Sequence, residues 1–158
     1  MNICVIPARG GSRRIPRKNI KEFNGKPIIA YSIEAALASS CIDQVIVSTD
    51  DEEISAVAKE YGAKVPFIRP EKLSTDYIAT NPVISHAVEW METHGNLIDT
   101  VCCLYATAPF VQSDTISDAY QNFKNCKADF CFSVTSFPFP IQRALKIDKS
   151  NKVGMFYP

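Results

Sequence analysis

The stretch that decides the fold runs from Ile6 to Asn19 and reads Ile-Pro-Ala-Arg-Gly-Gly-Ser-Arg-Arg-Ile-Pro-Arg-Lys-Asn. It follows a short apolar run, residues 3–6, which predicts a buried strand. Gly10 and Gly11 remove side chains just after that strand, so backbone N–H groups of the loop can approach a ligand closely. A loop at the carboxyl end of a strand is where α/β folds bind their ligands.

The same loop is strongly cationic. Ser12 adds a hydroxyl donor, and an arginine can bind phosphate through two parallel hydrogen bonds. The cations expected to contact a ligand are Arg9, Arg13 and Lys18. These properties favour a polyanion, above all a nucleoside triphosphate, although composition alone also allows a solvated basic loop with turn glycines. The loop matches neither the Walker A sequence nor the G-x-G-x-x-G dinucleotide fingerprint.

Downstream of the loop, short β-rich runs alternate with segments of helical periodicity. We expect strands at residues 44–48, 100–105 and 129–135, the second of them as a buried strand. We expect helices that begin near Pro27, Asp51, Asn81 and Ser113. This order predicts an α/β fold of three layers, in which a mainly parallel sheet carries helices on both faces.

Two motifs resemble the signature of the CMP-sugar synthetases, cytidylyltransferases that activate acidic sugars of eight or nine carbons. They are Ile-Pro-Ala-Arg-Gly-Gly-Ser-Arg-x-Ile-Pro-x-Lys-Asn-Ile at residues 6–20 and Gly-Lys-Pro-Ile-Ile at residues 25–29. Arg13 departs mildly from the family pattern, because most relatives carry lysine there. The resemblance covers the whole chain and implies a single domain, residues 1–158, with a Rossmann-like nucleotidyltransferase fold.

The resemblance implies a set of nucleotide-binding residues. They are Ala8, Arg9, Gly10, Gly11, Ser12, Arg13, Lys18, Asn19, Arg69 and Thr80. Arg9, Arg13 and Lys18 are expected to take part in catalysis as well. The segment Leu73–Asp76 belongs to the same motif as Arg69 and Thr80. Two alternatives stay open. Arg69 alone could be a surface cation, although its position in the family motif favours ligand binding. Asp50 is at least as well explained as a helix N-cap as by ligand contact.

The sugar site is expected in two further segments that look most like those of family members using pseudaminic acid. They read Tyr-Ala-Thr-Ala-Pro-Phe at residues 105–110 and Phe-Pro-Ile-Gln-Arg-Ala-Leu-Lys at residues 139–146. The sugar-binding residues that the resemblance implies are Tyr105, Thr107 and Arg143. Arg143 reads equally as a solvated charge.

The implied reaction transfers CMP from CTP to the anomeric hydroxyl of an acidic nine-carbon sugar and releases pyrophosphate, for glycosylation of surface glycans or flagellin. Magnesium is the implied cofactor. We expect its aspartate ligands beyond Pro158, because the family continues past this point and the chain resembles a truncated member. An inactive nucleotide-binding or dimerising fragment stays open as an alternative, as do sialic acid, legionaminic acid and Kdo as sugars.

Residues 136–158 differ in character from the rest of the chain. Phe-Pro-Phe-Pro at residues 137–140 precedes two β-rich runs, residues 144–148 and 152–157, which predict a projecting hairpin. Such a hairpin is a natural subunit contact, and the resemblance implies a homodimer formed through it. The alternative is a hairpin that folds back on the sheet.

Charge and composition narrow the classes of partner. The chain carries 17 basic and 17 acidic residues, yet residues 1–26 hold seven Lys or Arg and one acid, Glu22. This asymmetry favours a local anion site over a nucleic-acid surface. No apolar run approaches the roughly 18 residues of a membrane-spanning helix, and the N-terminus does not predict a signal peptide. Six cysteines without a C-x-x-C pair predict buried free thiols in a reducing cytoplasm.

Overall fold

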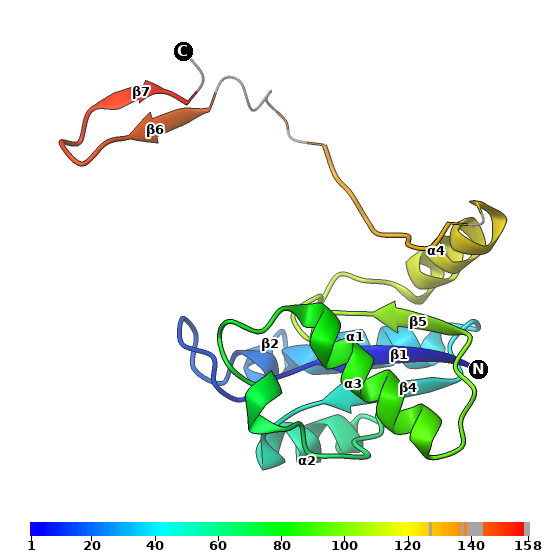
Figure 1. Ribbon diagram of the computed structural model, residues 1–158. Coiled ribbons are helices and arrows are strands. Elements are labelled where there is room, and N and C mark those ends of the chain that lie inside the picture. The colour runs from blue at the N-terminus through cyan, green and yellow to red at the C-terminus, as the bar shows by residue number, and fades with distance from the viewer. Residues whose placement is uncertain (127, 137, 139–143, 157–158) are drawn as a thin grey trace. The chain divides into compact units, whose positions relative to one another are not determined.

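The computed structural model describes residues 1–126, 128–136, 138 and 144–156. The chain divides into two compact units, Met1–Lys127 and Ala128–Pro158 (Figure 1). In the described residues the first unit contains the central sheet and the α-helices, and the second contains one hairpin.

A parallel sheet forms the centre of the first unit. β1 (Asn2–Pro7) lies between β4 (Gln44–Ser48) and β5 (Thr100–Cys103). The register of β1 and β4 ends with Pro7 opposite Ser48, so the two strands finish at the same level. The first two predicted strands are confirmed, and β5 ends two residues earlier than predicted.

The α-helices of the first unit begin close to their predicted positions. In the described residues they are α1 (Ile28–Ala38), α2 (Glu52–Glu60), α3 (Thr80–Thr93) and α4 (Ser113–Cys126). Shorter elements are η1 (Lys18–Ile20), β2 (Glu22–Phe23), β3 (Lys26–Pro27) and η2 (Glu71–Leu73). Gly62 and Gly95 follow α2 and α3 at φ angles of 92° and 83°, which glycine adopts without a Cβ clash.

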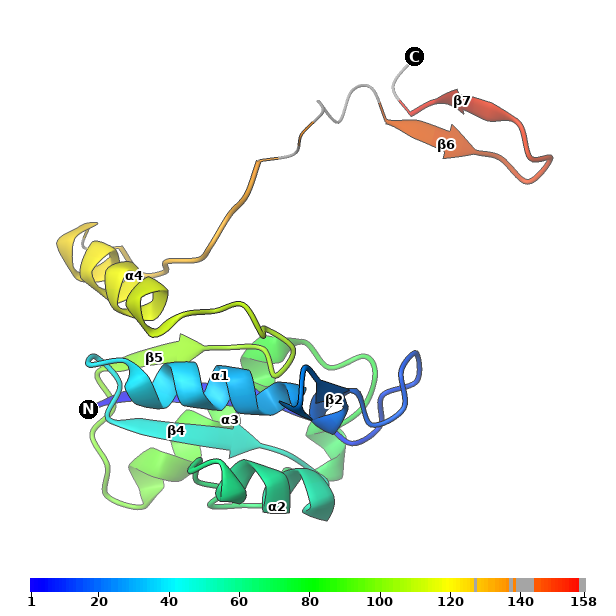
Figure 2. The same cartoon turned by 180° about the vertical axis from the view of Figure 1, so that it is seen from behind.

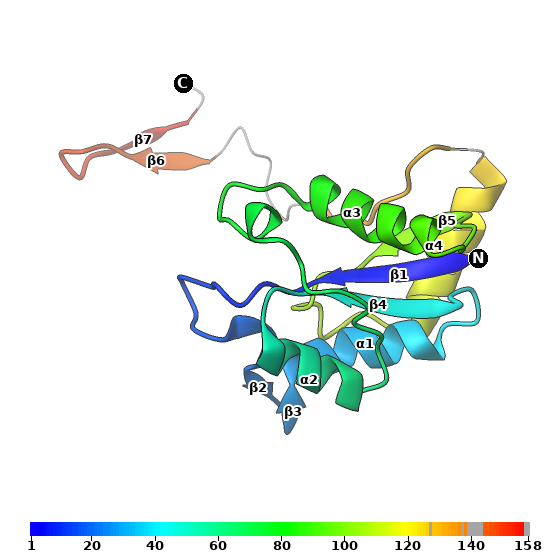
Figure 3. The ribbon, with the colours of Figure 1, turned by 60° about the horizontal axis from the view of Figure 1, so that its bottom comes forward.

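The sheet is covered on both faces, as predicted. Because successive side chains of a strand point to opposite faces, β1 serves two cores. Ile3 and Val5 pack in a cluster with residues of α3, whereas Cys4 and Ile6 pack in a cluster with residues of α1, α2 and α4. Figure 3 shows α3 on one side of β1 and β4, with α1 and α2 on the other. The three-layer α/β architecture is therefore confirmed.

Parallel pairing places the ends of all three strands at one edge of the sheet (Figure 2). Two backbone hydrogen bonds continue the pairing past the strand ends. The Ala8 N–H donates to the Ser48 carbonyl at 2.9 Å, and the Leu104 N–H donates to the Val5 carbonyl at 3.2 Å. Three segments therefore leave the sheet side by side. They are the glycine–arginine loop (residues 8–19), the residues after Ser48 and the residues after β5.

The second unit contains the predicted hairpin. β6 (Leu145–Ile147) pairs antiparallel with β7 (Val153–Met155). The turn is held by the Asp148 carboxylate, which accepts hydrogen bonds from the Ser150 and Lys152 N–H groups at 2.8 and 3.0 Å. The hydrogen bond from the Ser150 hydroxyl, together with those two backbone hydrogen bonds, lowers the pKa of Asp148.

The strand predicted at residues 129–135 is wrong for the described structure. The segment has no strand, although Phe130, Phe132 and Val134 alternate with smaller or polar residues as a half-buried strand would. These three side chains are 83%, 80% and 81% exposed. An alternating pattern forms a strand only where a neighbouring strand accepts its hydrogen bonds, and the described residues provide none here.

The prediction of buried thiols holds only in part. All six cysteines are free. Cys4 is buried, Cys41 and Cys102 are half-buried, and three are exposed: Cys103, Cys126 and Cys131. β5 is less buried than β1 or β4, which explains the exposed Cys103 at its end. Within the described ranges, no helix has the length and apolar character needed to cross a membrane.

Candidate functional site

A hydrogen bond from Asn19 to Arg9 joins the two ends of the loop that follows β1. Asn19 is buried, and its Nδ2 donates a hydrogen bond to the Arg9 carbonyl at 2.9 Å. Ala8, at the start of the loop, is fully buried. Both residues were predicted to contact nucleotide, and the structure assigns both of them to the frame of the loop. Their side chains therefore shape the loop between them.

A carboxylate from the neighbouring loop holds the first glycine. The Gly10 N–H donates to Asp50 Oδ1 at 2.9 Å. A Cβ placed on Gly10 would lie 2.6 Å from Asp51 Oδ2, whereas a Cβ on Gly11 would meet nothing within 4 Å. The close approach of the two loops thus requires glycine at position 10. Asp50 is not the helix cap, because Asp51 caps α2 by accepting the Ile54 N–H at 2.9 Å.

Arg17 joins the basic loop to α2. It adopts a left-handed backbone conformation, φ 54°, and its guanidinium contacts both oxygens of Asp51 at 2.5 and 2.9 Å. It also pairs with Glu53. The hydrogen bond from Arg17 is the main cause that lowers the pKa of Asp51, and the same pair raises the pKa of Arg17 above its ordinary value.

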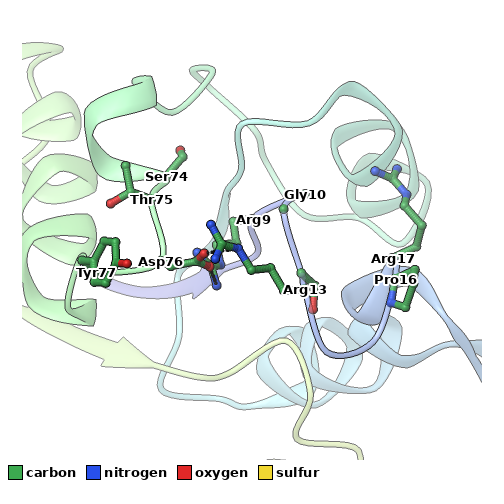
Figure 4. A pocket seen from close by; sticks show the side chains of 11 residues that line it. Arg9, Gly10, Arg13, Pro16, Arg17, Ser74, Thr75, Asp76 and Tyr77 are labelled. Atoms are coloured by element: carbon green, nitrogen blue, oxygen red, sulfur yellow. Dashed lines mark ion pairs between the residues drawn. The ribbon is translucent and has the colours of Figure 1, made fainter.

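A pocket of about 610 Å³ opens between this loop and the segment that follows η2. It is lined by Arg9, Gly10, Gly11, Ser12, Arg13, Pro16, Arg17, Ser74, Thr75, Asp76 and Tyr77. Inside it, Asp76 Oδ1 lies 2.6 Å from Arg9 Nη2, and Asp76 Oδ2 lies 2.5 Å from Arg13 Nε. Figure 4 shows Arg9 and Arg13 converging on Asp76. Five of the predicted nucleotide-binding residues are therefore brought together in one pocket.

Two other predicted cations lie outside the lining of this pocket. Lys18 is half-buried in η1. Arg69 is only 4% exposed, and its guanidinium donates to the carbonyl oxygens of Ser48 at 2.5 Å and Leu73 at 3.5 Å. Burial lowers the pKa of Arg69, and its Nε is a buried donor without a partner in the described structure. The surface-cation alternative for Arg69 is thus wrong.

One predicted sugar residue, Tyr105, lies close to Thr80, a predicted nucleotide-binding residue that lies outside the lining of the pocket. Thr80 begins α3, and its Oγ1 lies 3.5 Å from the Tyr105 hydroxyl. The backbone there is held by Ser32, whose Oγ donates to the Tyr105 carbonyl at 2.8 Å. Tyr105 is 61% exposed and Thr107 is half-buried. Arg143, the third predicted sugar residue, lies outside the described residues.

Sequence reasoning missed the partner of the arginines. Asp76 was assigned to a motif, but its pairing with Arg9 and Arg13 joins positions more than 60 residues apart. Arg17 and Tyr77 were missed as well. A motif indicates that a segment belongs to a site, whereas only the fold shows which charges meet there.

The pocket offers no ready magnesium site. No group of three or more His, Cys, Asp or Glu side chains able to hold a metal occurs in the part of the chain that the structure describes. The three nearby carboxylates are already engaged: Asp50 by Gly10, Asp51 by Arg17, and Asp76 by two arginines. Magnesium is usually fixed by one or two carboxylates with water and phosphate, so these residues alone do not fit it.

The parallel α/β fold with a cationic loop after its first strand is typical of nucleotide-binding proteins. The family model for cytidylyltransferases matches residues 3–154. The chain is 51% identical to the pseudaminic acid cytidylyltransferase of Campylobacter jejuni over 155 residues, which is 98% of this chain and 67% of that protein. The chain belongs to the cytidylyltransferase family, whose members are nucleotidyltransferase enzymes.

Two further similarities are to CMP-sugar synthetases. It is 42% identical to a CMP-N,N'-diacetyllegionaminic acid synthase of Legionella pneumophila, over 77% of this chain and 53% of that protein. Among solved structures it resembles a CMP:2-keto-3-deoxy-manno-octonic acid synthetase complexed with CTP, with a TM-score of 0.65 and 28% identity. That match covers 80% of this chain and 48% of the solved one, so the chain spans about half to two thirds of the length of these relatives.

The contrast between the two glycines gives a first prediction. We expect Gly10→Ala to weaken CTP binding and lower the free energy of unfolding, because its Cβ would displace an Asp51 side chain that Arg17 and the helix cap hold in place. The expected cost is about 1–3 kcal/mol. Calorimetric titration with CTP and urea unfolding measure the two effects. Gly11→Ala is the matched control. Equal effects of both substitutions would show that contact with Asp51 does not make glycine necessary at position 10.

The Arg17–Asp51 pair gives a pH-dependent prediction. We expect Arg17→Ala to raise the pKa of Asp51, which NMR titration of the Asp51 carboxyl measures directly. A carboxyl whose pKa is lowered by folding contributes stability above its unfolded pKa, and this contribution disappears as the pH falls through the folded pKa. The variant should therefore be less stable than the parent by under about 1 kcal/mol at neutral pH, since the pair is partly exposed, and equally stable in strong acid.

Arg14→Ala is the control for this titration. Arg14 is exposed on the same loop, and no ion pair is found for it among the described residues. It should leave the pKa of Asp51 unchanged. An unchanged pKa in Arg17→Ala, or a stability difference that persists in strong acid, would show that the pair does not stabilise the loop electrostatically.

Proposed function

We propose that this protein transfers CMP from CTP to the anomeric hydroxyl of an acidic nonulosonic sugar, pseudaminic acid in the first place, and releases pyrophosphate. The observation that carries the proposal is the 51% identity to a pseudaminic acid cytidylyltransferase, maintained over 98% of the chain. The pocket supports it, because glycine backbone and two arginines converge there at the carboxyl end of β1. We further propose that the product serves glycosylation of a surface glycan or flagellin.

The chemistry needs alignment and charge neutralisation more than covalent help from the protein. The anomeric oxygen forms a bond to the α-phosphorus of CTP, the bond from that phosphorus to the bridging oxygen breaks, and the hydroxyl proton is released. Negative charge develops on the leaving pyrophosphate. In this proposal Arg9 and Arg13, which line the pocket, bind those oxygens, and Gly11 and Ser12 add backbone and hydroxyl donors from the same loop. In this proposal Lys18 adds a third cation from η1.

The sugar is proposed to bind next to the nucleotide, near Thr80, Tyr105 and Thr107. Tyr77 lines the phosphate pocket and lies three residues before Thr80, so the two groups of residues are joined by a short segment. The close approach of Thr80 and Tyr105 brings the start of α3 to the end of β5. A sugar bound there would lie beside the phosphates that it attacks.

Two parts of the proposal go beyond the pocket. We propose that the magnesium ligands lie in the part of the family's length that these residues do not span. We also propose a homodimer formed through the β6–β7 hairpin. One face of this hairpin carries Leu145, Ile147, Val153 and Met155, each between 52% and 70% exposed, and burying such a face is favourable.

Product analysis tests the proposed reaction. We expect mass spectrometry to detect a CMP-sugar and pyrophosphate after incubation of the protein with CTP, magnesium and pseudaminic acid. Parallel reactions contain legionaminic acid, sialic acid or Kdo, and others replace CTP by ATP, GTP or UTP. A product formed with another sugar instead of pseudaminic acid would revise the proposed sugar substrate. A product formed with another nucleotide would refute the assignment as a cytidylyltransferase. The absence of any product would refute the proposed activity.

The cations of the loop give a separate prediction. We expect Arg13→Ala and Lys18→Ala each to weaken CTP binding about tenfold to one-hundredfold, because a hydrogen bond to a charged group contributes about 1.5–3 kcal/mol. Calorimetric titration measures the affinity, and thermal unfolding checks that each variant keeps its fold. Lys21→Ala removes an exposed cation from the same region and is the control. Unchanged CTP affinity in both loop variants would show that Arg13 and Lys18 do not bind CTP.

A further inference from the structure

Asp76 occupies the place in the pocket where a ligand phosphate is expected. Each of its two carboxylate oxygens takes one arginine, Oδ1 with Arg9 at 2.6 Å and Oδ2 with Arg13 at 2.5 Å. The Asp76 side chain is 22% exposed, while those of Arg9 and Arg13 are 32% and 80% exposed. The carboxylate thus lies at the inner end of a pocket whose outer arginine is open to solvent.

The two other carboxylates beside the loop, Asp50 and Asp51, are held in place by contacts that support the fold. Asp50 holds the Gly10 N–H, and Asp51 caps α2 and pairs with Arg17. Asp76 makes no such contact in the described structure, where its recorded polar partners are the two arginines. It lies between η2 and α3, in a stretch without regular secondary structure, beside the 91% exposed Tyr77. Asp76 is therefore the carboxylate that can leave without unfolding an element.

A polyphosphate bound to Arg9 and Arg13 competes with Asp76 for the guanidinium N–H groups that Asp76 occupies in the free protein. If a phosphate were bound on Arg9 and Arg13 with Asp76 in place, two anions would lie within a few ångströms, and like charges at that distance repel strongly. One anion must give way to the other. The carboxylate carries one negative charge, whereas pyrophosphate and triphosphate present several charged oxygens to the same donors.

We propose that Asp76 is an internal counter-anion that holds Arg9 and Arg13 together in the free protein and is exchanged for the polyphosphate of the ligand. The inference deepens the proposed function, on whose phosphate site it rests. Breaking the two ion pairs subtracts a fixed free energy from the binding of every ligand that uses both arginines. Asp76 therefore lowers the affinity of every such ligand by the same factor, and it favours release of the pyrophosphate product by taking back the two arginines.

Titration of the whole chain with inorganic pyrophosphate tests this exchange. We expect Asp76→Asn to bind pyrophosphate about three to ten times more tightly than the parent, as expected when two partly exposed ion pairs no longer compete. Asp76→Ala removes the same carboxylate without adding an amide and should show the same direction of change. The increase should shrink at high salt, because salt screens charges on a partly exposed site.

Glu71→Gln is the matched control. It removes one negative charge five residues away, from an exposed side chain of η2 for which the described structure records no ion pair. Its pyrophosphate affinity should equal that of the parent. Thermal unfolding identifies folded variants, and either Asp76 variant suffices for the test. An equal increase in Glu71→Gln would show a general charge effect and overturn the proposal.

The remaining outcomes separate this inference from the proposed function. Equal or weaker pyrophosphate binding by folded Asp76 variants overturns the exchange and makes Asp76 a positioning residue for the arginines. If CMP-sugar forms without that increase in affinity, the exchange fails and the proposed function stands. If the increase occurs without CMP-sugar formation, the exchange stands and the proposed function fails. Absence of pyrophosphate binding in every variant overturns both the exchange and the phosphate site.

Discussion

The parallel pairing of β1 with β4 is the constraint on which the rest of the site depends. Because Pro7 lies opposite Ser48, the chain leaves both strands at one level, and the Ala8 N–H extends the pairing by one further hydrogen bond. The glycine–arginine loop therefore runs directly against the residues that start α2. Gly10 tolerates this approach because it has no Cβ, and a larger residue would collide with Asp51. Backbone pairing thus places a cationic loop beside a cluster of carboxylates.

That neighbourhood explains how so many positive charges are held at one end of a chain whose net charge is zero. Arg17 pairs with Asp51, the cap of α2, whereas Arg9 and Arg13 share the single carboxylate of Asp76. The first pair belongs to the frame, because Asp51 also satisfies the Ile54 N–H at the helix start. The second pair joins the loop to a segment without regular structure. Arginines of the same loop therefore have different roles. The role depends on whether the partner carboxylate belongs to a helix or to a segment without regular structure.

The architecture and the core of the site could be predicted from the sequence, while the electrostatic partners could not. Continuous apolar runs predicted β1 and β4 well, since buried parallel strands need them on both faces. Alternation over residues 129–135 failed, because a pattern records which side chains are apolar and not whether a neighbouring strand is present. The cations Lys18 and Arg69 were grouped with Arg13 by charge and motif, but burial separates them: Arg69 is nearly inaccessible and Arg13 is open.

Arg69 shows why the wall of the pocket can carry an exchangeable charge. Its buried guanidinium binds the Ser48 carbonyl at the end of β4, and its backbone N–H donates to the Thr49 carbonyl at 2.8 Å. Burying a cation costs free energy, which these hydrogen bonds and the nearby Asp50 carboxylate offset in part. The hydrogen bonds of Arg69 hold the start of the following segment at the sheet edge, and the other end of the segment continues into α3 at Thr80. Between two fixed ends, residues 74–77 keep Asp76 within reach of the arginines without tying it to a helix or a strand.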